Sequence, residues 1–472
     1  QRQMCIRDRA DMSNDAPGPV SVFHFVSRFD AHPPLFYVAL HAWIGLVGTP
    51  AEWLLRLPFA LCSVAALGAA CLLARRLLPA PAARTAMLLA ACSQASVWCA
   101  QEIRMYAMLA MFVSWAAWFG ARAWLDDWRP GWAGWVLLSL AGACTHYLGG
   151  FAVVAFAVWT LRVRPATPSA SRWRWGALLF IALGFLAWSP VLLFQTRAGH
   201  GPPALAGVGP ARMFDSLPST LVDLVWGPSL PLRLPAGAPI ALAAVATLGL
   251  ALWGARHTPR EGKWLAALQL AVPVLLLLGV GEGLGRNLLQ PRFFMYLAPF
   301  TSLLLAPLVA TRAGRVAVAL IVAVNAISLA SWYLDPTFQR QPLRAAAEHV
   351  RAFATTEDLV LVEDAIGIYP IRYYLPAEIC PALVGVHPVR LEDGSLAAFL
   401  KGRRTIWLVL SDAWVVDPEN RVFGWLASRA TVAEPPRVFA CYDPSHSVVV
   451  FRFEAHPGNL PEENSRAART KR

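Results

Sequence analysis

The stretch PGWAGWVLLSLAGACTHYLGGFAVVAFAVWTL, residues 130–161, decides the fold. It runs for 32 residues without a charge, although a helix needs only about 20 apolar residues to cross a bilayer core about 30 Å thick. The run is therefore too long for one crossing. Adjacent glycines favour a turn, and Gly149 and Gly150 stand near its middle. We expect two membrane helices that separate near His146 and Tyr147.

The composition of the whole chain agrees with a membrane protein. Of its 472 residues, 57% are apolar and only 15% are charged, whereas soluble domains average about 45–50% and about 25%. This excludes an ordinary soluble enzyme, a disordered chain and a fibre. About ten spans are expected, because eight further charge-free runs occur at 57–74, 85–100, 105–121, 175–196, 234–255, 264–281, 293–311 and 316–334. The expected fold is an α-helical polytopic membrane protein.

The net charge of +12 is explained largely by membrane topology. Short cytoplasmic loops are enriched in Lys and Arg, and alternate loops of this chain are basic, such as residues 162–174 with four arginines. In that orientation the polar clusters around His32, Glu102, His146 and Arg292 all lie at the extracytoplasmic face. Their convergence on one face favours a site there, and nucleic acid is not an expected partner.

Residues 336–456 differ in pattern from the spans. Amphipathic and short apolar stretches alternate there, which predicts a small extracytoplasmic α/β domain. Its expected elements are a helix at 341–354 and apolar strands at 359–362, 405–410, 438–441 and 447–453. Cys380 and Cys441 are candidates for a disulfide on that side of the membrane. The polar tail at 457–472 is expected to be disordered.

The N-terminal residues 1–27 do not continue the membrane pattern. QRQMCIRDR, residues 1–9, has no apolar region of the kind a signal peptide needs. With an even number of spans, an extracytoplasmic N-terminus also lacks a means of crossing the membrane. We therefore expect the native protein to carry a first transmembrane helix ahead of the membrane domain at 28–335.

Four motifs stand at the expected ends of spans. They are FDAHPPLFY at 29–37, QEIRMYA at 101–107, THY at 145–147 and QPRFFMYLAP at 290–299. In this order they resemble the GT-C glycosyltransferases of the protein-O-mannosyltransferase and aminoarabinose-transferase type, glycosyltransferase family 39 and its relatives. The resemblance covers residues 28–335. It implies inverting transfer of a sugar from a polyprenyl-phosphate donor to a hydroxyl of a lipid, glycan or protein, outside the bacterial inner membrane.

That chemistry needs a carboxylate to accept the proton of the acceptor hydroxyl. It also needs cationic groups, or a divalent metal ion, to neutralise the departing phosphate. By resemblance the catalytic candidates are Asp30 and Glu102. The family usually places its base in an Asp-Glu pair after its first span, but no such pair precedes His32. We therefore expect the main base in the missing or altered N-terminal segment, where Asp11 and Asp15 are further candidates in a different context. The substrate-binding candidates are His32, Arg104, Tyr106, His146, Tyr147, Arg292 and Tyr296.

Ordinary structural roles exist for the same residues. Asp30 suits a cap of the following helix, Glu102 and Arg104 suit an interfacial ion pair, and Arg292 suits a snorkelling anchor. The alternative function is a transporter or a non-catalytic membrane protein that handles lipid-linked sugars. A transporter is disfavoured, because the span centres carry few ionisable groups and no internal repeat is found.

Overall fold

The computed structural model describes most of the chain. Described are residues 22–24, 26–27, 32–48, 51–197, 211–229, 238–284, 288, 291–338, 342–363, 368–375, 380, 382–386, 400, 402–411, 417–441 and 447–456. They form two compact units, a membrane unit within Ser13–Ser331 and a C-terminal unit within Trp332–Arg472. The tail at 457–472 and most of residues 1–27, for which sequence expectations were made, lie outside the described residues.

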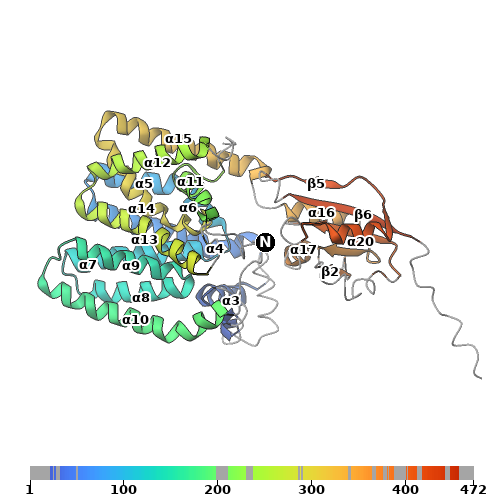
Figure 1. The fold of residues 1–472 in the computed structure, drawn as a ribbon, viewed down its shortest axis with the longest axis horizontal. Coiled ribbons are helices and arrows are strands. Elements are labelled where there is room, and N and C mark those ends of the chain that lie inside the picture. Colours follow the sequence, from blue (N-terminus) through green and yellow to red (C-terminus); the bar gives the residue numbers. More distant parts are fainter. Residues whose placement is uncertain are drawn as a thin grey trace, which may run out of the picture. The chain divides into compact units, whose positions relative to one another are not determined.

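Long apolar helices make up most of the membrane unit (Figure 1). Among the described residues six are long and apolar enough to cross a membrane: α4 (Glu52–Leu77), α7 (Tyr106–Leu125), α10 (Pro168–Arg197), α12 (Ala238–His257), α13 (Arg260–Leu284) and α15 (Arg312–Leu334). Each covers one of the charge-free runs expected to span. The prediction of a multi-pass α-helical membrane protein is confirmed, while the total of ten spans stays a prediction.

The long uncharged run is divided as expected. It forms α8 (Pro130–Thr145) and α9 (Leu148–Arg162), which are separated by the two residues His146 and Tyr147. The helices approach closely beside this turn, since a Cβ on Gly149 would lie 2.5 Å from the carbonyl carbon of Gly142. A glycine at this position therefore lets the backbones meet.

The run at 85–100 is not one helix. It lies in α5 (Ala80–Cys92) and α6 (Gln94–Gln101). The backbone N–H of Gln94 donates to Oδ1 of Asn325, at 2.9 Å, so the first amide of α6 has a partner outside the helix. This long-range bond accompanies the break that the local sequence did not predict.

Asn325 of α15 joins three parts of the membrane unit. Its Oδ1 accepts from Gln94, and its Nδ2 donates to the carbonyl oxygen of Val225 at 2.8 Å and to that of Ile321 at 2.9 Å. Val225 belongs to α11 (Ala211–Trp226), the helix between the charge-free runs at 175–196 and 234–255. One buried amide thus fixes α6, α11 and α15 together.

The run at 293–311 is also broken. It contains short 3-10 and α-helical pieces, which are η2 (Pro291–Phe293), η3 (Met295–Leu297), α14 (Ala298–Leu305) and η4 (Ala306–Ala310). Proline lacks the amide that continues a helix, so it is tolerated mainly in a first turn. Pro299 and Pro307 each stand in the first turn of a new piece, which accounts for the interruptions.

A short apolar helix follows the HPP motif. It is α3 (Leu35–Val47), and it ends at Gly48, whose φ of 76° lies in the left-handed region. Trp43 ties α3 to the start of α4, because its indole N–H donates to the carbonyl oxygen of Leu54 at 2.8 Å. This bond fixes α3 against the first turn of α4.

The C-terminal unit contains a mixed sheet between helices. The described strands are β1 (Leu359–Val362), β2 (Leu383–Gly385), β3 (Thr405–Leu410), β4 (Ala430–Val432), β5 (Arg437–Phe439) and β6 (Val448–Ala455). Their order is β2-β1-β3-β6-β4, with β5 also paired to β6; β2, β1 and β3 are parallel, and β6 is antiparallel to its neighbours. The expected small α/β domain is confirmed.

Helices cover both faces of this sheet. On one face pack α16 (Leu343–Phe353) and α17 (Ile368–Tyr374), and on the other packs α20 (Arg421–Ala427). The amphipathic pattern at 341–354 thus predicted α16 correctly. Two apolar layers explain why β1 and β3 read as continuous hydrophobic runs rather than alternating ones.

The expected disulfide is wrong. Cys380, one member of the expected pair, is a free cysteine. Cys380 is buried in the core beside Ile371 and Leu383, and burial raises the pKa of its thiol. We predict that denatured protein alkylated without reductant carries the label on Cys380. Labelling of Cys380 that appears only after reduction would contradict this result.

Candidate functional site

The predicted site residues of the membrane unit stand at helix ends. His32 precedes α3, Glu102 ends α6, Tyr106 begins α7, and His146 and Tyr147 form the turn between α8 and α9. Arg292 and Tyr296 lie in the short helices η2 and η3. Three further candidates, Asp30, Asp11 and Asp15, lie outside the described residues.

Four aromatic rings from distant parts of the sequence form one cluster. The ring of His146 lies 5.3 Å from that of His32, 5.9 Å from that of Tyr106 and 5.8 Å from that of Phe293, measured between centroids. Tyr106 and Phe293 are 6.3 Å apart. The structure thus brings all four sequence motifs together, with His146 at the centre.

The hydrogen bonding of His146 indicates its tautomer. Its Nδ1 accepts from the backbone N–H of Leu148 at 3.1 Å. In a neutral imidazole one nitrogen accepts while the other carries the proton. The Nε2 atom of His146 therefore carries the hydrogen, and it is a donor suited to a phosphate oxygen.

Glu102 is the acidic group of the site that the structure describes. Its side chain is fully buried, with 0% exposed, and its backbone N–H donates to the carbonyl oxygen of Trp98 at 3.2 Å. The ring of Trp98 in turn lies 6.1 Å from that of Tyr106. Glu102 is therefore fixed on a short helix that contacts the cluster, and Arg104, half-buried, follows in the link to α7.

Arg292 and Tyr296 differ in their surroundings. The guanidinium carbon of Arg292 lies 5.6 Å from the ring of Phe293, which places this cation at the edge of the aromatic cluster. Tyr296 is 0% exposed and packs in the apolar core. Its hydroxyl has no hydrogen-bond partner among the described residues. Contact of Tyr296 with substrate stays a prediction.

Sequence reasoning missed a hydrogen-bonded support for the cluster. The hydroxyl of Tyr147 donates to Oε1 of Gln195 at 2.5 Å and accepts from the indole N–H of Trp188 at 3.2 Å. Gln195 is buried, and its Nε2 donates to the carbonyl oxygens of His32 and Val26, both at 3.4 Å. Gln195 thus ties α10 to two motifs. The signal that the sequence offered was a glutamine near the end of an apolar span.

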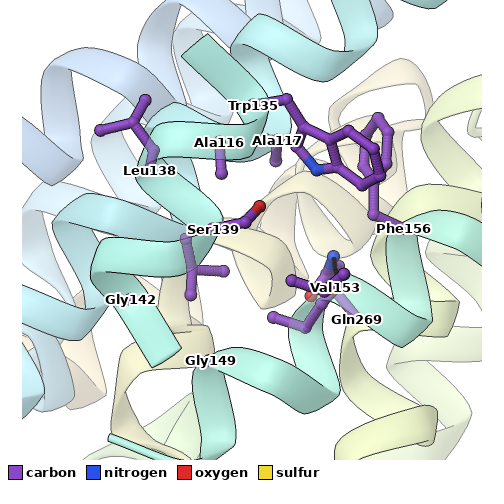
Figure 2. Close-up of a pocket in the computed structure, with 12 residues that line it drawn as sticks. Ala116, Ala117, Trp135, Leu138, Ser139, Gly142, Gly149, Val153, Phe156 and Gln269 are labelled. Atoms are coloured by element: carbon purple, nitrogen blue, oxygen red, sulfur yellow. Dashed lines mark hydrogen bonds between the residues drawn. The ribbon is translucent and has the colours of Figure 1, made fainter. Parts of the chain in front are cut away.

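An internal cavity lies between α7, α8, α9 and α13 (Figure 2). Its lining includes Ser139, Gly142, Gly149 and Gln269, and its volume is about 10 Å³. That space accepts about one water molecule and is far too small for a sugar. The cavity is therefore not the substrate site, and the aromatic cluster remains the candidate.

A metal ion was a candidate cofactor. Within the part of the chain that the structure describes, no three His, Cys, Asp or Glu side chains converge to hold one. A divalent metal ion at the site stays a prediction.

Asp223 gives the region a pH dependence. It lies on α11, which packs against η2 and α6, and burial raises the pKa of its carboxyl from 3.8 to about 7. The folded protein therefore disfavours the charged form, and stability is lost as the pH rises through that interval. We predict that Asp223→Asn raises Tm at about pH 8 and leaves it nearly unchanged at about pH 4.

Asp335→Asn is the matched control for this measurement. Asp335 accepts hydrogen bonds from the backbone N–H and hydroxyl of Thr337, which lower the pKa of its carboxyl. Its replacement is therefore not expected to raise Tm at about pH 8. Thermal unfolding of the detergent-purified protein across the pH range checks both variants. A gain for Asp223→Asn that is the same at every pH would contradict the assignment.

The comparison with protein families gives a match over residues 31–194. The matching family is described as dolichyl-phosphate-mannose-protein mannosyltransferase. The matched segment includes His32, Glu102, Tyr106 and His146, which come from three of the four motifs. No curated protein matches the chain in sequence.

Solved structures of glycosyltransferases are distantly similar to the chain. One is ArnT from Cupriavidus metallidurans bound to undecaprenyl phosphate, with 16% identity, a TM-score of 0.42 and coverage of 98% of this chain and 93% of that chain. Another is the oligosaccharyltransferase of Archaeoglobus fulgidus, tethered with an acceptor peptide, with 12% identity, a TM-score of 0.41 and coverage of 92% and 67%. The chain is therefore similar to this mannosyltransferase family over residues 31–194, the segment that carries three of the four motifs.

Proposed function

We propose that this protein transfers a sugar, with inversion, from a polyprenyl-phosphate carrier to an acceptor hydroxyl at the extracytoplasmic face of a bacterial inner membrane. The observation that carries the proposal is the convergence of His32, Tyr106, His146 and Phe293 in one cluster, since each comes from a different motif. The description of the matching family, which names a sugar on dolichyl phosphate, supports the class of donor.

The reaction requires a group that accepts the acceptor proton and groups that stabilise the departing phosphate. The acceptor oxygen attacks the anomeric carbon from the face opposite the phosphate, and the bond between that carbon and the phosphate oxygen breaks. The acceptor proton passes to a carboxylate, for which Glu102 is our first candidate and Asp30 the second. The departing phosphate gains negative charge, and the Nε2–H of His146 and the guanidinium of Arg292 are the groups that stabilise it.

The test compares site variants with matched controls far from the cluster. Full-length protein in proteoliposomes is given labelled polyprenyl-phosphate sugars, and transfer to added acceptors is measured. His146→Gln and Arg292→Gln are each expected to lower the rate by about 10²-fold, as loss of one stabilising donor does elsewhere. His257→Gln and Arg256→Gln, at exposed positions ending α12, should transfer at the wild-type rate.

Two outcomes would refute the proposal at different levels. Folded His146 and Arg292 variants with unchanged rates would refute the assigned site, while the proposed sugar transfer would still stand. A wild-type protein that transfers no sugar from any polyprenyl-phosphate donor would refute the activity itself.

A further inference from the structure

Arg174 is a buried cation held between two tryptophans. It lies in the second turn of α10 and is 7% exposed. Its guanidinium carbon is 5.4 Å from the ring of Trp124 and 4.5 Å from that of Trp175. One nitrogen, Nη1, donates to the hydroxyl of Thr160 at 3.5 Å. The two rings and this hydrogen bond fix the plane of the guanidinium.

The described residues supply no counter-charge to Arg174. None of the ion pairs among them includes it, and its Nε has no hydrogen-bond partner there. Asp127 is the acidic residue that touches this end of α10, where it accepts from the hydroxyl of Ser169 at 3.4 Å, but it forms no ion pair with the arginine. A buried charge without a partner is costly, so the arrangement favours an anion from outside the chain.

The charges and aromatic residues nearby select the kind of anion. The neighbouring cations Arg162, Arg164 and Arg172 are exposed and attract negative charge to this end of the span. Trp173 is 49% exposed and Trp175 is 61% exposed, and tryptophans of this kind lie at the level of the lipid headgroups. An anion at that depth is the phosphate of a membrane lipid.

We propose that Arg174 binds the headgroup phosphate of an anionic phospholipid. A guanidinium presents two parallel N–H donors to two oxygens of one phosphate, and Nη1 remains bonded to Thr160. The tryptophan rings orient this donor edge, while the exposed arginines add long-range attraction.

This lipid site is separate from the proposed transfer site. Arg174 and Gln195 stand on the same helix, and 21 residues of α10 separate them. At a rise of 1.5 Å per residue the two are about 32 Å apart along the axis. The two sites therefore lie near opposite ends of one span, and the lipid proposal does not depend on the sugar donor.

The experiment measures how lipid stabilises the delipidated, full-length protein in detergent. Phosphatidylglycerol is titrated against Tm, because a ligand that binds only the folded state raises it. For Arg174→Gln we expect the half-saturating lipid concentration to rise about tenfold. Arg172→Gln removes the same charge from an exposed neighbour and should change the half-saturating lipid concentration by less than about twofold. Arg174→Lys keeps the charge without the paired donors. Its half-saturating lipid concentration should lie between those of Arg172→Gln and Arg174→Gln.

The outcomes distinguish a lipid site from general attraction. Phosphatidylcholine and inorganic phosphate should raise the Tm of the wild type much less than phosphatidylglycerol does. Equal stabilisation by inorganic phosphate, or equal losses for Arg172→Gln and Arg174→Gln, would overturn the proposal. If Arg174→Gln does not fold, native mass spectrometry of Arg174→Lys and the wild type decides, and equal retention of phosphatidylglycerol would overturn it.

Discussion

Glu102→Gln is expected to slow sugar transfer by a factor of about 10²–10⁴, the usual contribution of a general base. Glutamine has nearly the shape of glutamate but cannot accept the acceptor proton. Because Glu102 is fully buried at the end of α6, a near-isosteric change should leave the packing intact. Initial rates with saturating donor and acceptor, measured together with Tm, check this expectation.

The control for this variant is Glu261→Gln. Glu261 lies in the first turn of α13, where its backbone oxygen accepts from the indole N–H of Trp159 at 2.9 Å. That bond does not involve the side chain, so the control should keep wild-type activity. A folded Glu102→Gln protein with a rate within about twofold of the wild type would remove Glu102 from the mechanism.

Gly149→Ala is expected to destabilise the protein and to lower its activity together. The added Cβ would lie 2.5 Å from the carbonyl carbon of Gly142 and 2.6 Å from the backbone nitrogen of Ala143. Backbone atoms cannot turn aside as a flexible side chain can, so α8 and α9 must separate. Overpacking of this kind costs about 1–3 kcal/mol, and it displaces the turn that carries His146.

Gly176→Ala provides the comparison. Gly176 is also helical, but a Cβ there meets no atom within 4 Å, and alanine favours a helix by up to about 1 kcal/mol over glycine. Its Tm should be unchanged or higher, with normal transfer. Equal Tm values for the two alanine variants would contradict the close crossing of α8 and α9.

The sequence was a good guide to the long helices and a poorer one to the interrupted ones. Charge-free runs predicted α4, α10 and α15, because a segment in lipid must satisfy its own backbone and therefore forms a helix. The break before Gln94 could not be predicted, since it involves Asn325, which lies 231 residues away. Pro299 and Pro307 begin new helical pieces in the run at 293–311, because a proline interrupts a continuous helix.

The candidate site was predicted in part. The motifs supplied His32, Tyr106 and His146, and the structure brings their rings together. Gln195 and Trp188 were missed, because one polar and one aromatic residue near the end of an apolar helix look like ordinary interfacial residues. Only the fold reveals that both contact Tyr147. The disulfide failed because two cysteines in one domain carry no information about their separation.

Asn325 has a consequence for how motion can spread through the membrane unit. Asn325 is 3% exposed, so its bonds to Gln94, Val225 and Ile321 are not readily exchanged for bonds to solvent. The short helix that ends at Glu102 is consequently not free to shift alone. Any displacement of that carboxylate by an incoming ligand would be passed on to two distant helices as a single coupled movement.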